Sequence, residues 1–370
     1  MQTLKQRLST LIEERGPITI ADFMQIVLTD PNHGYYSKQD PLGAQGDFIT
    51  APEISQVFGE LLGIWCAHYW HELGEPSNTM LVELGPGRGT LMKDLLRATK
   101  NVPNFHKSIT VHMVESSPVL TQKQQQTLSG EKVKIQWHAD FSTVPDGITL
   151  LVANEFFDAL PIHQFVKTTQ GWRERLVGYQ KSQFTFTLAK HETPAAKLIP
   201  PKFADAPNNS FIEVSPACAA VMHQISERIM HFGGAALIID YGYTFKEPAD
   251  TLQAVKDHQY HSVLEDIGDA DITAHVDFPL LAGTAMAAGA KVHPAVSQFQ
   301  LLQALGIQFR AASLIKKATP EQQEDIIRAV ERLMHPNEMG TLFKCIAITQ
   351  PDAPAPLGFG PISDGQAAKA

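Results

Sequence analysis

Short apolar runs that each end in polar residues recur along the chain and predict a central sheet. Buried strands are expected at 80–84, 108–114, 133–137, 148–153, 235–239 and, last, 340–349. Helical or short connections join the first four, which is the pattern of a parallel, doubly wound sheet. Ligands of such sheets bind at the carboxyl ends of the strands. The pattern therefore predicts an α/β fold with its site where these strands end.

Apolar residues at helical spacing surround this predicted sheet. Two helices are expected near the N-terminus, at 4–12 and from about 19 to just before Asp30. A third is expected at 53–71, shortly before the first strand. Further helices are predicted at 91–96, from Pro118, and at 221–232, 299–305 and 320–333.

Three segments depart from this alternation of strands and helices. Residues 30–55 form a long stretch punctuated by glycine and proline, and loops of this length are usually functional. Residues 162–210 alternate apolar and polar positions, which predicts inserted antiparallel strands beside the substrate. Residues 243–285 are rich in His and Asp with little periodicity, and we expect a second excursion over the site.

These patterns divide the chain into segments with different expected roles. The N-terminal helical region and active-site loop are expected at 1–78, a Rossmann-like core at 79–161 and 211–245, an inserted antiparallel β segment at 162–210, a second insertion at 246–300, C-terminal helices with the last core strand at 301–350, and a loose tail at 351–370.

Composition narrows the function classes. The chain of 370 residues is 44% apolar, carries a net charge of −9 and has no dense Lys/Arg block, so nucleic acid is not an expected partner. Cys66, Cys218 and Cys345 form neither a metal pattern nor a disulfide framework. No apolar run has membrane-spanning length, and the N-terminus resembles no targeting peptide. We therefore expect a bacterial cytoplasmic protein with no metal; the oligomeric state is not indicated.

The run VELGPGRGT at 82–90 carries the clearest chemical signal. Gly85, Gly87 and Gly89 follow the first strand at once, and glycine lets the backbone turn sharply and approach a ligand closely. The third glycine is one residue too early for a dinucleotide fingerprint, and no phosphate loop is present. Glu83 at the strand end suits a ligand with a positive amino group. The pattern predicts S-adenosylmethionine as cofactor; the alternative is a tight turn without a ligand.

Other residues are candidates for the same cofactor. Glu115, after the second strand, is placed to accept hydrogen bonds from both ribose hydroxyls, or else to favour the N-terminus of the next helix. Asp140, after the third strand, either binds the adenine amino group or is a plain turn residue. Thr50, Pro52 and Glu53 begin a helix that closes over the ligand or is only a capped helix start.

Asn154, Glu155 and Asp158 follow the fourth strand and are the catalytic candidates. Methyl transfer is an in-line displacement, so the protein chiefly positions the reactants and excludes water. Paired carboxylates at Glu155 and Asp158 suit a cationic nucleophile such as a guanidinium. Their alternative role is an acid-rich first helical turn. His275 and Asp277 are a weaker candidate acid/base pair.

Several stretches resemble the MidA-like family of class I S-adenosylmethionine-dependent methyltransferases. The resemblance covers nearly the whole chain, to about residue 358, with the departure LTDP at 28–31, where an aromatic residue often precedes the Asp. The matching motifs are HGYYS (33–37), GDFITAPEIS (46–55), VELGPGRGTLMKDLLR (82–97), ANEFFDALPIHQF (153–165), GWRERLVGY (171–179), IIDYGY (238–243), DITAHVDF (271–278) and MGTLFKCIAIT (339–349).

The resemblance implies an activity. Mitochondrial members are regarded as protein-arginine methyltransferases that modify a core subunit of respiratory complex I and help its assembly. It implies that Gly85, Gly87, Gly89 and Glu115 bind the cofactor, and that an arginine of a partner protein, such as a complex I subunit, is the acceptor. A small-molecule methyltransferase and a cofactor-binding assembly factor without essential catalysis stay open. A nicotinamide dehydrogenase is disfavoured by the glycine spacing.

Overall fold

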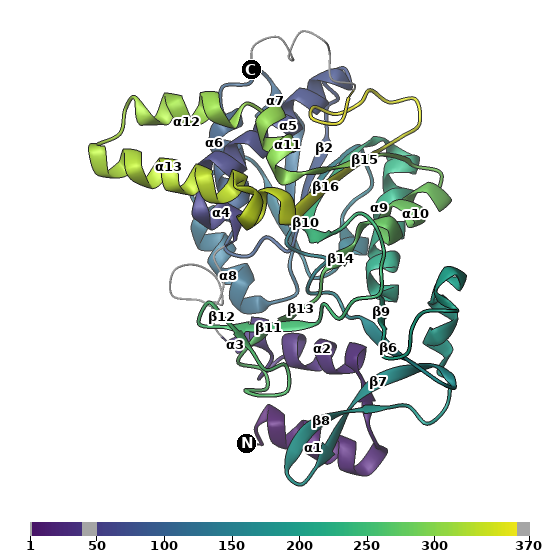
Figure 1. The fold of residues 1–370 in the computed structure, drawn as a ribbon. Coiled ribbons are helices and arrows are strands. Elements are labelled where there is room, and N and C mark those ends of the chain that lie inside the picture. Colours follow the sequence, from purple (N-terminus) through teal and green to yellow (C-terminus); the bar gives the residue numbers. More distant parts are fainter. Residues whose placement is uncertain (1, 39–49, 361–370) are drawn as a thin grey trace.

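The structure is a computed structural model that describes residues 2–38 and 50–360, and Figure 1 shows how their elements are arranged. Residues 39–49, which belong to the loop expected at 30–55, lie outside the described residues, as do residues 361–370 of the expected tail.

A mixed sheet forms the centre of the molecule, with strand order β15-β16-β10-β5-β2-β3-β4. The five strands from β4 to β10 in this order run parallel, so their carboxyl ends meet at one edge of the sheet. Strand β16 runs antiparallel to β10, and the edge strand β15 runs antiparallel to β16. Every strand predicted from an apolar run is present with its bounds shifted by a few residues. The bounds are β2 (Thr79–Leu84), β3 (Ile109–Val114), β4 (Ile135–His138), β5 (Thr149–Asn154), β10 (Gly234–Tyr243), β15 (Lys291–Ser297) and β16 (Phe343–Thr349), and β14 (Val276–Asp277) pairs with the end of β10.

Helices cover both faces of this sheet, as a doubly wound fold requires. Side chains alternate along β5, so that Leu150 and Val152 pack on one face and Leu151 and Ala153 on the other. The first face is covered by α5 (Gln56–Glu72), α6 (Thr90–Thr99) and α7 (Phe105–Ser108); the second by α9 (Pro216–Phe232) and α10 (Phe278–Ala287). Two helical elements contact the edge strand β4: α8 (Pro118–Thr127), whose Gln124 accepts a hydrogen bond from Trp137, and a 3-10 helix at Phe141–Thr143, whose Thr143 hydroxyl hydrogen-bonds with His138.

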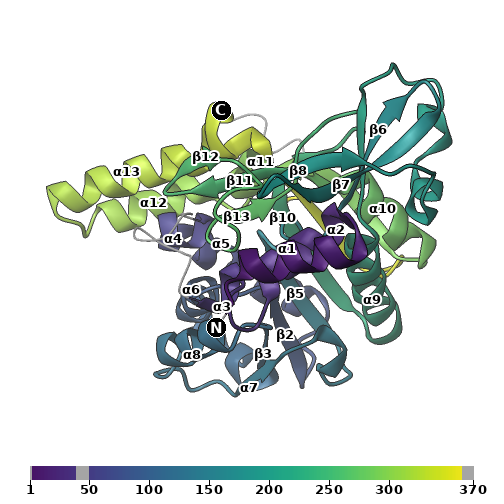
Figure 2. The ribbon, with the colours of Figure 1, turned by 90° about the horizontal axis from the view of Figure 1, so that it is seen from below.

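A second body, which we call the cap, covers the carboxyl ends of the parallel strands. It consists of residues 2–38, 162–215 and 251–275, and we call the other described residues the core. Figure 2 shows α1 and α2 lying across this end of the sheet. The cap has its own apolar cluster, in which Phe23 of α2, Val177 of β7 and Ile272 of β13 are buried.

The cap elements come from three separate parts of the chain. Strand β1 of the N-terminal part pairs with β7 of the insertion, which ties the two parts together. The bounds are α1 (Leu4–Arg15), β1 (Ile18–Thr19), α2 (Ile20–Thr29), α3 (Tyr35–Lys38), β6 (His163–Thr168), β7 (Gly171–Gln180), β8 (Gln183–Leu188), 3-10 helices at Pro194–Leu198 and Pro201–Phe203, β9 (Phe211–Val214), β11 (Gln253–Lys256), β12 (Gln259–His261) and β13 (Asp271–Thr273).

A helical hairpin projects from the core on the side of α5 and α6 (Figure 1). The buried Glu60 carboxylate of α5 accepts hydrogen bonds from Arg97 of α6 and from Arg310 of the hairpin. This ion pair fastens the hairpin to the core. The C-terminal helices are α11 (Gln298–Ala304), the hairpin helices α12 (Ile307–Ile315) and α13 (Pro320–Met334), and a π-helical turn at Pro336–Gly340.

Several expected boundaries need correction. The region 1–78 is not one unit, because α1 to α3 join the cap whereas α4 (Ala51–Ile54) and α5 pack on the core. Strand β9 pairs with β6, so the core resumes after Ser215 and not at residue 211. The second insertion, expected at 246–300, also contributes α10 and β15 to the core. The single helix expected at 53–71 is interrupted at Ser55, whose backbone is extended and whose side chain accepts from the Val57 N–H.

The tail is not loose over residues 351–360. Trp65 and Tyr69 of α5 donate hydrogen bonds from their side chains to the carbonyls of Leu357 and Pro354, and Phe359 is buried against the core. Two aromatic side chains of α5 thereby hold this segment in place.

Among the described residues no helix combines the length and the apolar character that a bilayer crossing requires. Within 2–38 and 50–360, no three His, Cys, Asp or Glu side chains are grouped as a metal site would need. The three cysteines are buried and free.

Candidate functional site

A cavity of about 210 Å³ lies between the carboxyl ends of the parallel strands and the cap. The core supplies strand ends, the glycine loop and α4, and the cap supplies Tyr36 and Asp271. Of the residues predicted as site residues, all but Gly89 and Asp140 line it. Those that do are Thr50, Pro52, Glu53, Glu83, Gly85, Gly87, Glu115, Asn154, Glu155 and Asp158.

The glycine loop opens one end of the cavity. Gly85 has φ +61°, and a Cβ there would lie 2.9 Å from the Phe156 ring, so a larger residue would meet both strain and a clash. Gly89 has φ +79° and forms the N-terminal cap of α6. Its role is therefore to make the turn from loop to helix, and it does not line the cavity.

Glu83 ends β2 under this loop. Its side chain is 3% exposed, and its Oε2 atom has no hydrogen-bond partner. Burial raises the pKa of Glu83 well above its usual range. A buried acceptor without a donor is costly unless a ligand satisfies it. An amino group brought by a cofactor is the kind of donor that this carboxyl group lacks.

Glu115 lies on the same side of the cavity, after β3. Its Oε1 accepts from the Ser117 N–H at 2.8 Å, and its Oε2 accepts from the Gln124 side-chain amide at 3.2 Å. The same amide donates to the Gly87 carbonyl at 2.9 Å, which fixes the carboxylate relative to the glycine loop. Burial raises the pKa of Glu115 to about 7.

Asp140 lies away from these groups. Its carboxylate accepts from the Ser142 backbone N–H at 2.8 Å and from the Ser142 hydroxyl at 2.6 Å, and so caps the 3-10 helix at Phe141–Thr143. This is the turn role that the sequence left open for Asp140. The adenine contact, its other expected role, has no support from this position.

The other end of the cavity carries Asn154, Glu155 and Asp158. Glu155 has a left-handed backbone with φ +50°, an uncommon conformation for a non-glycine residue. Its Oε1 accepts from the Ala51 N–H at 3.0 Å and from the Asn154 side-chain amide at 3.1 Å. Burial raises the pKa of Glu155 to about 7. The alternative for these acids, a helical first turn, is not what forms, because no helix starts at 155–158.

The Asp158 carboxylate is positioned by a hydrogen bond from the neighbouring strand β10. Its Oδ2 accepts from the Tyr241 hydroxyl at 2.6 Å, and burial raises its pKa to about 6. Its Oδ1 has no partner, and neither has the Asn154 Oδ1, although both side chains are less than 10% exposed. The Asn154 Oδ1 and the Asp158 Oδ1 are therefore two buried acceptors beside Glu155 that have no donor.

Asp240 on β10 shapes the turn that carries these groups. Its fully buried Oδ2 accepts from the backbone N–H groups of Phe156, Phe157 and Asp158, at 3.1, 3.0 and 3.3 Å. Neither Asp240 nor Tyr241 was singled out from the sequence. The signal was present, since both end the fifth predicted strand, where polar residues reach the same edge of the sheet.

Helix α4 connects the two ends of the cavity. Thr50 is its N-cap residue but makes no side-chain cap hydrogen bond. Glu53 accepts a hydrogen bond from the Thr90 hydroxyl at the start of α6 and lies 3.5 Å from the Arg88 guanidinium. Because Ala51 also donates to Glu155, this short helix links the glycine loop to the turn at 155–158.

His275 and Asp277 do not form an acid/base pair. The His275 ring stacks edge-on against Tyr241 with 5.6 Å between ring centres, whereas Asp277 caps α10 and pairs with Lys246. Both have structural partners, and neither lines the cavity.

The chemistry of this cavity is that of a methyltransferase, and comparison with known proteins gives the same result. The family model Methyltransf_28, of S-adenosyl-L-methionine-dependent methyltransferases, matches residues 61–296. The chain belongs to this family.

Relatives cover most of the chain. It is 39% identical to the mitochondrial protein arginine methyltransferase NDUFAF7 of Homo sapiens, over 91% of this chain and 81% of that protein. Identity to the Drosophila melanogaster homologue is 39%, over 94% of this chain and 84% of that protein. A Burkholderia thailandensis protein crystallised with S-adenosyl-homocysteine has a similar fold, with a TM-score of 0.81, 26% identity, and coverage of 96% of this chain and 93% of that one.

The comparisons confirm the resemblance to MidA-like methyltransferases, the class I fold, the enzyme class and S-adenosylmethionine as cofactor. One expectation is wrong. We expected a bacterial cytoplasmic protein, but the NDUFAF7 relatives, which are 39–40% identical over 91% of the chain, are mitochondrial proteins. The absence of a recognisable targeting sequence does not determine where a protein works.

Proposed function

We propose that the protein transfers a methyl group from S-adenosylmethionine to an arginine guanidinium of a partner protein. The observation that carries this proposal is the pair of buried, unpartnered oxygens on Asn154 and Asp158 beside the Glu155 carboxylate. A guanidinium has five N–H donors and no acceptor, so it matches the two unpartnered acceptor oxygens and the neighbouring carboxylate. The NDUFAF7 relatives, named as protein arginine methyltransferases, support the same acceptor.

The core is the proposed cofactor domain. Glu83, Gly85, Gly87 and Glu115 would hold S-adenosylmethionine, and Thr50, Pro52 and Glu53 of the α4 region would close over it. The unpartnered Glu83 Oε2 suits the amino group, and the fixed Glu115 carboxylate suits the ribose hydroxyls. When bound, the cofactor supplies an electrophilic methyl carbon on a sulfonium.

The acceptor residues would position the nucleophile and take its proton. A guanidinium nitrogen forms the new bond to carbon as the carbon–sulfur bond breaks, and the bonding pair leaves with sulfur. The nitrogen then has one proton in excess. Glu155, whose pKa is raised to about 7, is suited to accept that proton near neutral pH. Asp158 would hold the remaining N–H groups.

A small-molecule acceptor is the second candidate. The cap folds over the cavity, and Tyr36 and Asp271 form part of its lining, which is the covering that a small-molecule enzyme needs. The same lining is compatible with a single arginine side chain inserted from a protein surface. An experiment must distinguish the two.

The test uses S-adenosylmethionine labelled on its methyl group and an extract of cells that lack this protein. The wild-type protein is expected to label a protein at arginine. Asp158→Asn should label it at least about tenfold more slowly, since it removes one charged hydrogen-bond partner of the acceptor guanidinium. Gly87→Val should abolish cofactor binding, and the exposed Asp146→Asn serves as the matched neutral control. Label only in small molecules would favour the second candidate, and no transfer at all would favour an assembly factor that merely binds the cofactor.

A further inference from the structure

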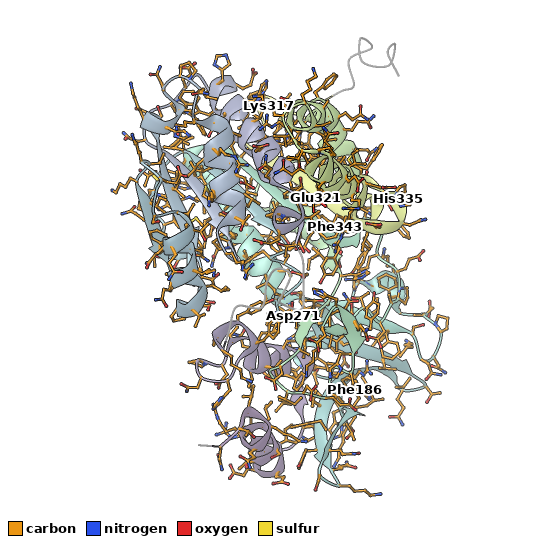
Figure 3. The ribbon with its side chains drawn as sticks, turned by 90° about the vertical axis from the view of Figure 1, so that its left-hand side faces the viewer. Phe186, Asp271, Lys317, Glu321, His335 and Phe343 are labelled. Carbon is orange, nitrogen blue, oxygen red and sulfur yellow. The ribbon has the colours of Figure 1, made fainter. Side chains whose placement is uncertain are left out.

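The acceptor end of the cavity contains one carboxylate that comes from the cap and not from the core. Asp271 lies on β13, is 7% exposed and lines the cavity together with Glu155 and Asp158. Figure 3 shows it where the cap meets the core, between Phe186 of the cap and Phe343 of the sheet. We propose that Asp271 is a third carboxylate of the acceptor site, positioned by Tyr36, and that the acceptor guanidinium is bound between cap and core. This inference rests on the proposed arginine methylation.

Tyr36 holds Asp271 from the N-terminal part of the cap. Its hydroxyl donates to the Asp271 Oδ1 at 3.1 Å. Burial, followed by the charges of Asp271 and Asp158, raises the pKa of Tyr36, so the phenol stays protonated and remains a donor.

Asp271 and Asp158 are also joined through the backbone. The Ala274 N–H, three residues after Asp271, donates to the Asp158 carbonyl at 3.0 Å. The Tyr36 carbonyl accepts from the Ser117 hydroxyl at 2.6 Å, and Ser117 in turn donates its N–H to Glu115. Tyr36 is therefore fixed at both ends, by the cofactor side through Ser117 and by the acceptor side through Asp271.

A cluster of acids does not make a site without a separate sign of its ligand, and the Asn154 side-chain amide gives that sign. Asn154 lines the cavity, is 8% exposed, and its Oδ1 is buried without a hydrogen-bond partner. The Asp158 Oδ1 is likewise buried and without a partner. Both are acceptors, as are the carboxylates of Glu155 and Asp271. A cation with several donors in one plane satisfies such a set better than the single point of an ammonium group. An alkyl guanidinium is the chemical class that fits.

The experiment measures binding of acetyl-arginine amide to the full-length protein saturated with S-adenosylhomocysteine, followed by NMR titration. Asp271→Asn is expected to weaken this binding about tenfold or more, as for the loss of one charged hydrogen-bond partner. Tyr36→Phe should weaken it less. The double variant should be no weaker than Asp271→Asn alone, because Tyr36 acts through Asp271.

Controls separate this inference from the proposed function. Asp269→Asn removes an exposed carboxylate of the same segment that pairs with Lys38 and lies outside the cavity, and it should bind the probe as the wild type does. S-adenosylhomocysteine affinity and the melting temperature of each variant show that it is folded. If Asp158→Asn weakens probe binding and Asp271→Asn does not, the cap carboxylate is not part of the site although arginine methylation stands. Additive losses in the double variant would overturn the positioning role of Tyr36. If the wild-type protein binds no probe, both proposals fail.

Discussion

At the scale of single residues, the acceptor carboxylates make the activity depend on pH. Burial raises the pKa of Asp158 to about 6 and that of Glu155 to about 7, and both must be ionised to hold a cation and take its proton. We expect kcat/KM for methyl transfer to rise between about pH 5.5 and 7.5, because kcat/KM reports the groups of the free enzyme. The charge of Asp158 in turn acts to raise the pKa of its titratable neighbours Glu155, Asp240, Tyr36, Tyr241 and Cys218.

Tyr241→Phe tests the assignment of this acid limb. The Tyr241 hydroxyl donates to Asp158 and so lowers its pKa against the effect of burial. Without the hydroxyl, the rise of kcat/KM should move to higher pH. The value of kcat/KM at pH 6 should therefore fall more than the value on the plateau above pH 7.5. A profile that is flat from pH 5.5 to 8, or unmoved in Tyr241→Phe, contradicts the roles given to these carboxylates.

The same burial means that the ionised Glu155 side chain lowers the free energy of unfolding at neutral and higher pH. Its folded-state pKa lies above the unfolded value, so its contribution to stability is fully present below about pH 4 and is lost as pH rises through about 7. Glu155→Gln keeps an oxygen to accept from Ala51 and Asn154 but cannot ionise. We expect the ligand-free variant to be about 1–3 kcal/mol more stable than wild type at pH 8, discounted because Glu155 is partly exposed to the cavity.

Denaturant unfolding at pH 5 and pH 8 measures this effect. The added stability of Glu155→Gln should be smaller at pH 5, where the wild-type Glu155 is already protonated. Methyl transfer by this variant should be lost at both pH values. Destabilisation at pH 8 would mean that the carboxylate has a favourable partner in the ligand-free protein.

At the scale of elements, the helical hairpin of α12 and α13 depends on one buried carboxylate. Glu60 is 2% exposed, and the Arg97 and Arg310 guanidiniums hold its pKa below its usual value although burial acts to raise it. Arg310→Ala leaves this carboxylate with Arg97 as its remaining guanidinium partner in the described contacts, and we expect a loss of about 1–3 kcal/mol of unfolding free energy.

Arg328→Ala is the matched control on the same hairpin. Arg328 pairs with Asp325 and Glu324 on the exposed surface of α13, where an ion pair contributes little, so its loss should leave the free energy of unfolding close to that of the wild type. Thermal unfolding of both variants at one ionic strength compares them. Equal effects would show that the buried carboxylate does not anchor the hairpin.

Some helices and strands could be predicted from the sequence and others could not. Strands β2, β3, β5, β10 and β16 were predictable because each is a short apolar run buried on both faces, whereas the predicted edge strand β4 is only half-buried. Since β2, β3 and β5 run parallel, their polar ends meet at one edge, and Glu83, Glu115, Asn154 and Glu155 could be grouped from sequence order alone. Strand β15 was missed because it is an edge strand interrupted at Pro294, where its pairing with β16 shifts register.

Two helices were missed for different reasons. Helix α10, FPLLAGTAMA, is almost uniformly apolar and therefore shows no periodicity; it packs beside α9 on the same face of the sheet. Helix α12 is short and follows α11 after only two residues, so the two look like one region of weak pattern.

At the scale of the whole molecule, the cap was hidden from the sequence because its parts meet only in space. Tyr36 and Asp271 are 235 residues apart, and although the motifs HGYYS and DITAHVDF contain them, neither side chain was a candidate site residue. Their pairing depends on strand β1 joining β7 and on α2 packing under β13, contacts that no local periodicity encodes. The cofactor half of the site is local in sequence, whereas the acceptor half is assembled from distant segments.

Because the cap contributes to the acceptor half of the site and the core to the cofactor half, we expect a destabilised cap to lower methyl transfer without lowering cofactor affinity. Phe23 is fully buried in the cap cluster, and Phe23→Ala should cost about 3–5 kcal/mol within that cluster. We expect methyl transfer to fall at least about tenfold while S-adenosylhomocysteine affinity stays within about twofold of wild type, because Glu83, Gly85 and Glu115 lie on the core. Calorimetric titration with the cofactor product and a labelled-methyl assay measure the two quantities at one temperature.

Phe58→Ala is the corresponding change in the core. Phe58 is equally buried but belongs to α5, which packs against α6 behind the glycine loop, so this variant should lose cofactor affinity and methyl transfer together. The temperature must lie below the first unfolding transition of both variants, as monitored by circular dichroism. If Phe23→Ala lowers cofactor affinity as much as Phe58→Ala does, the cap and core act as one cooperative unit, and the acceptor half of the site cannot be separated from the cofactor half.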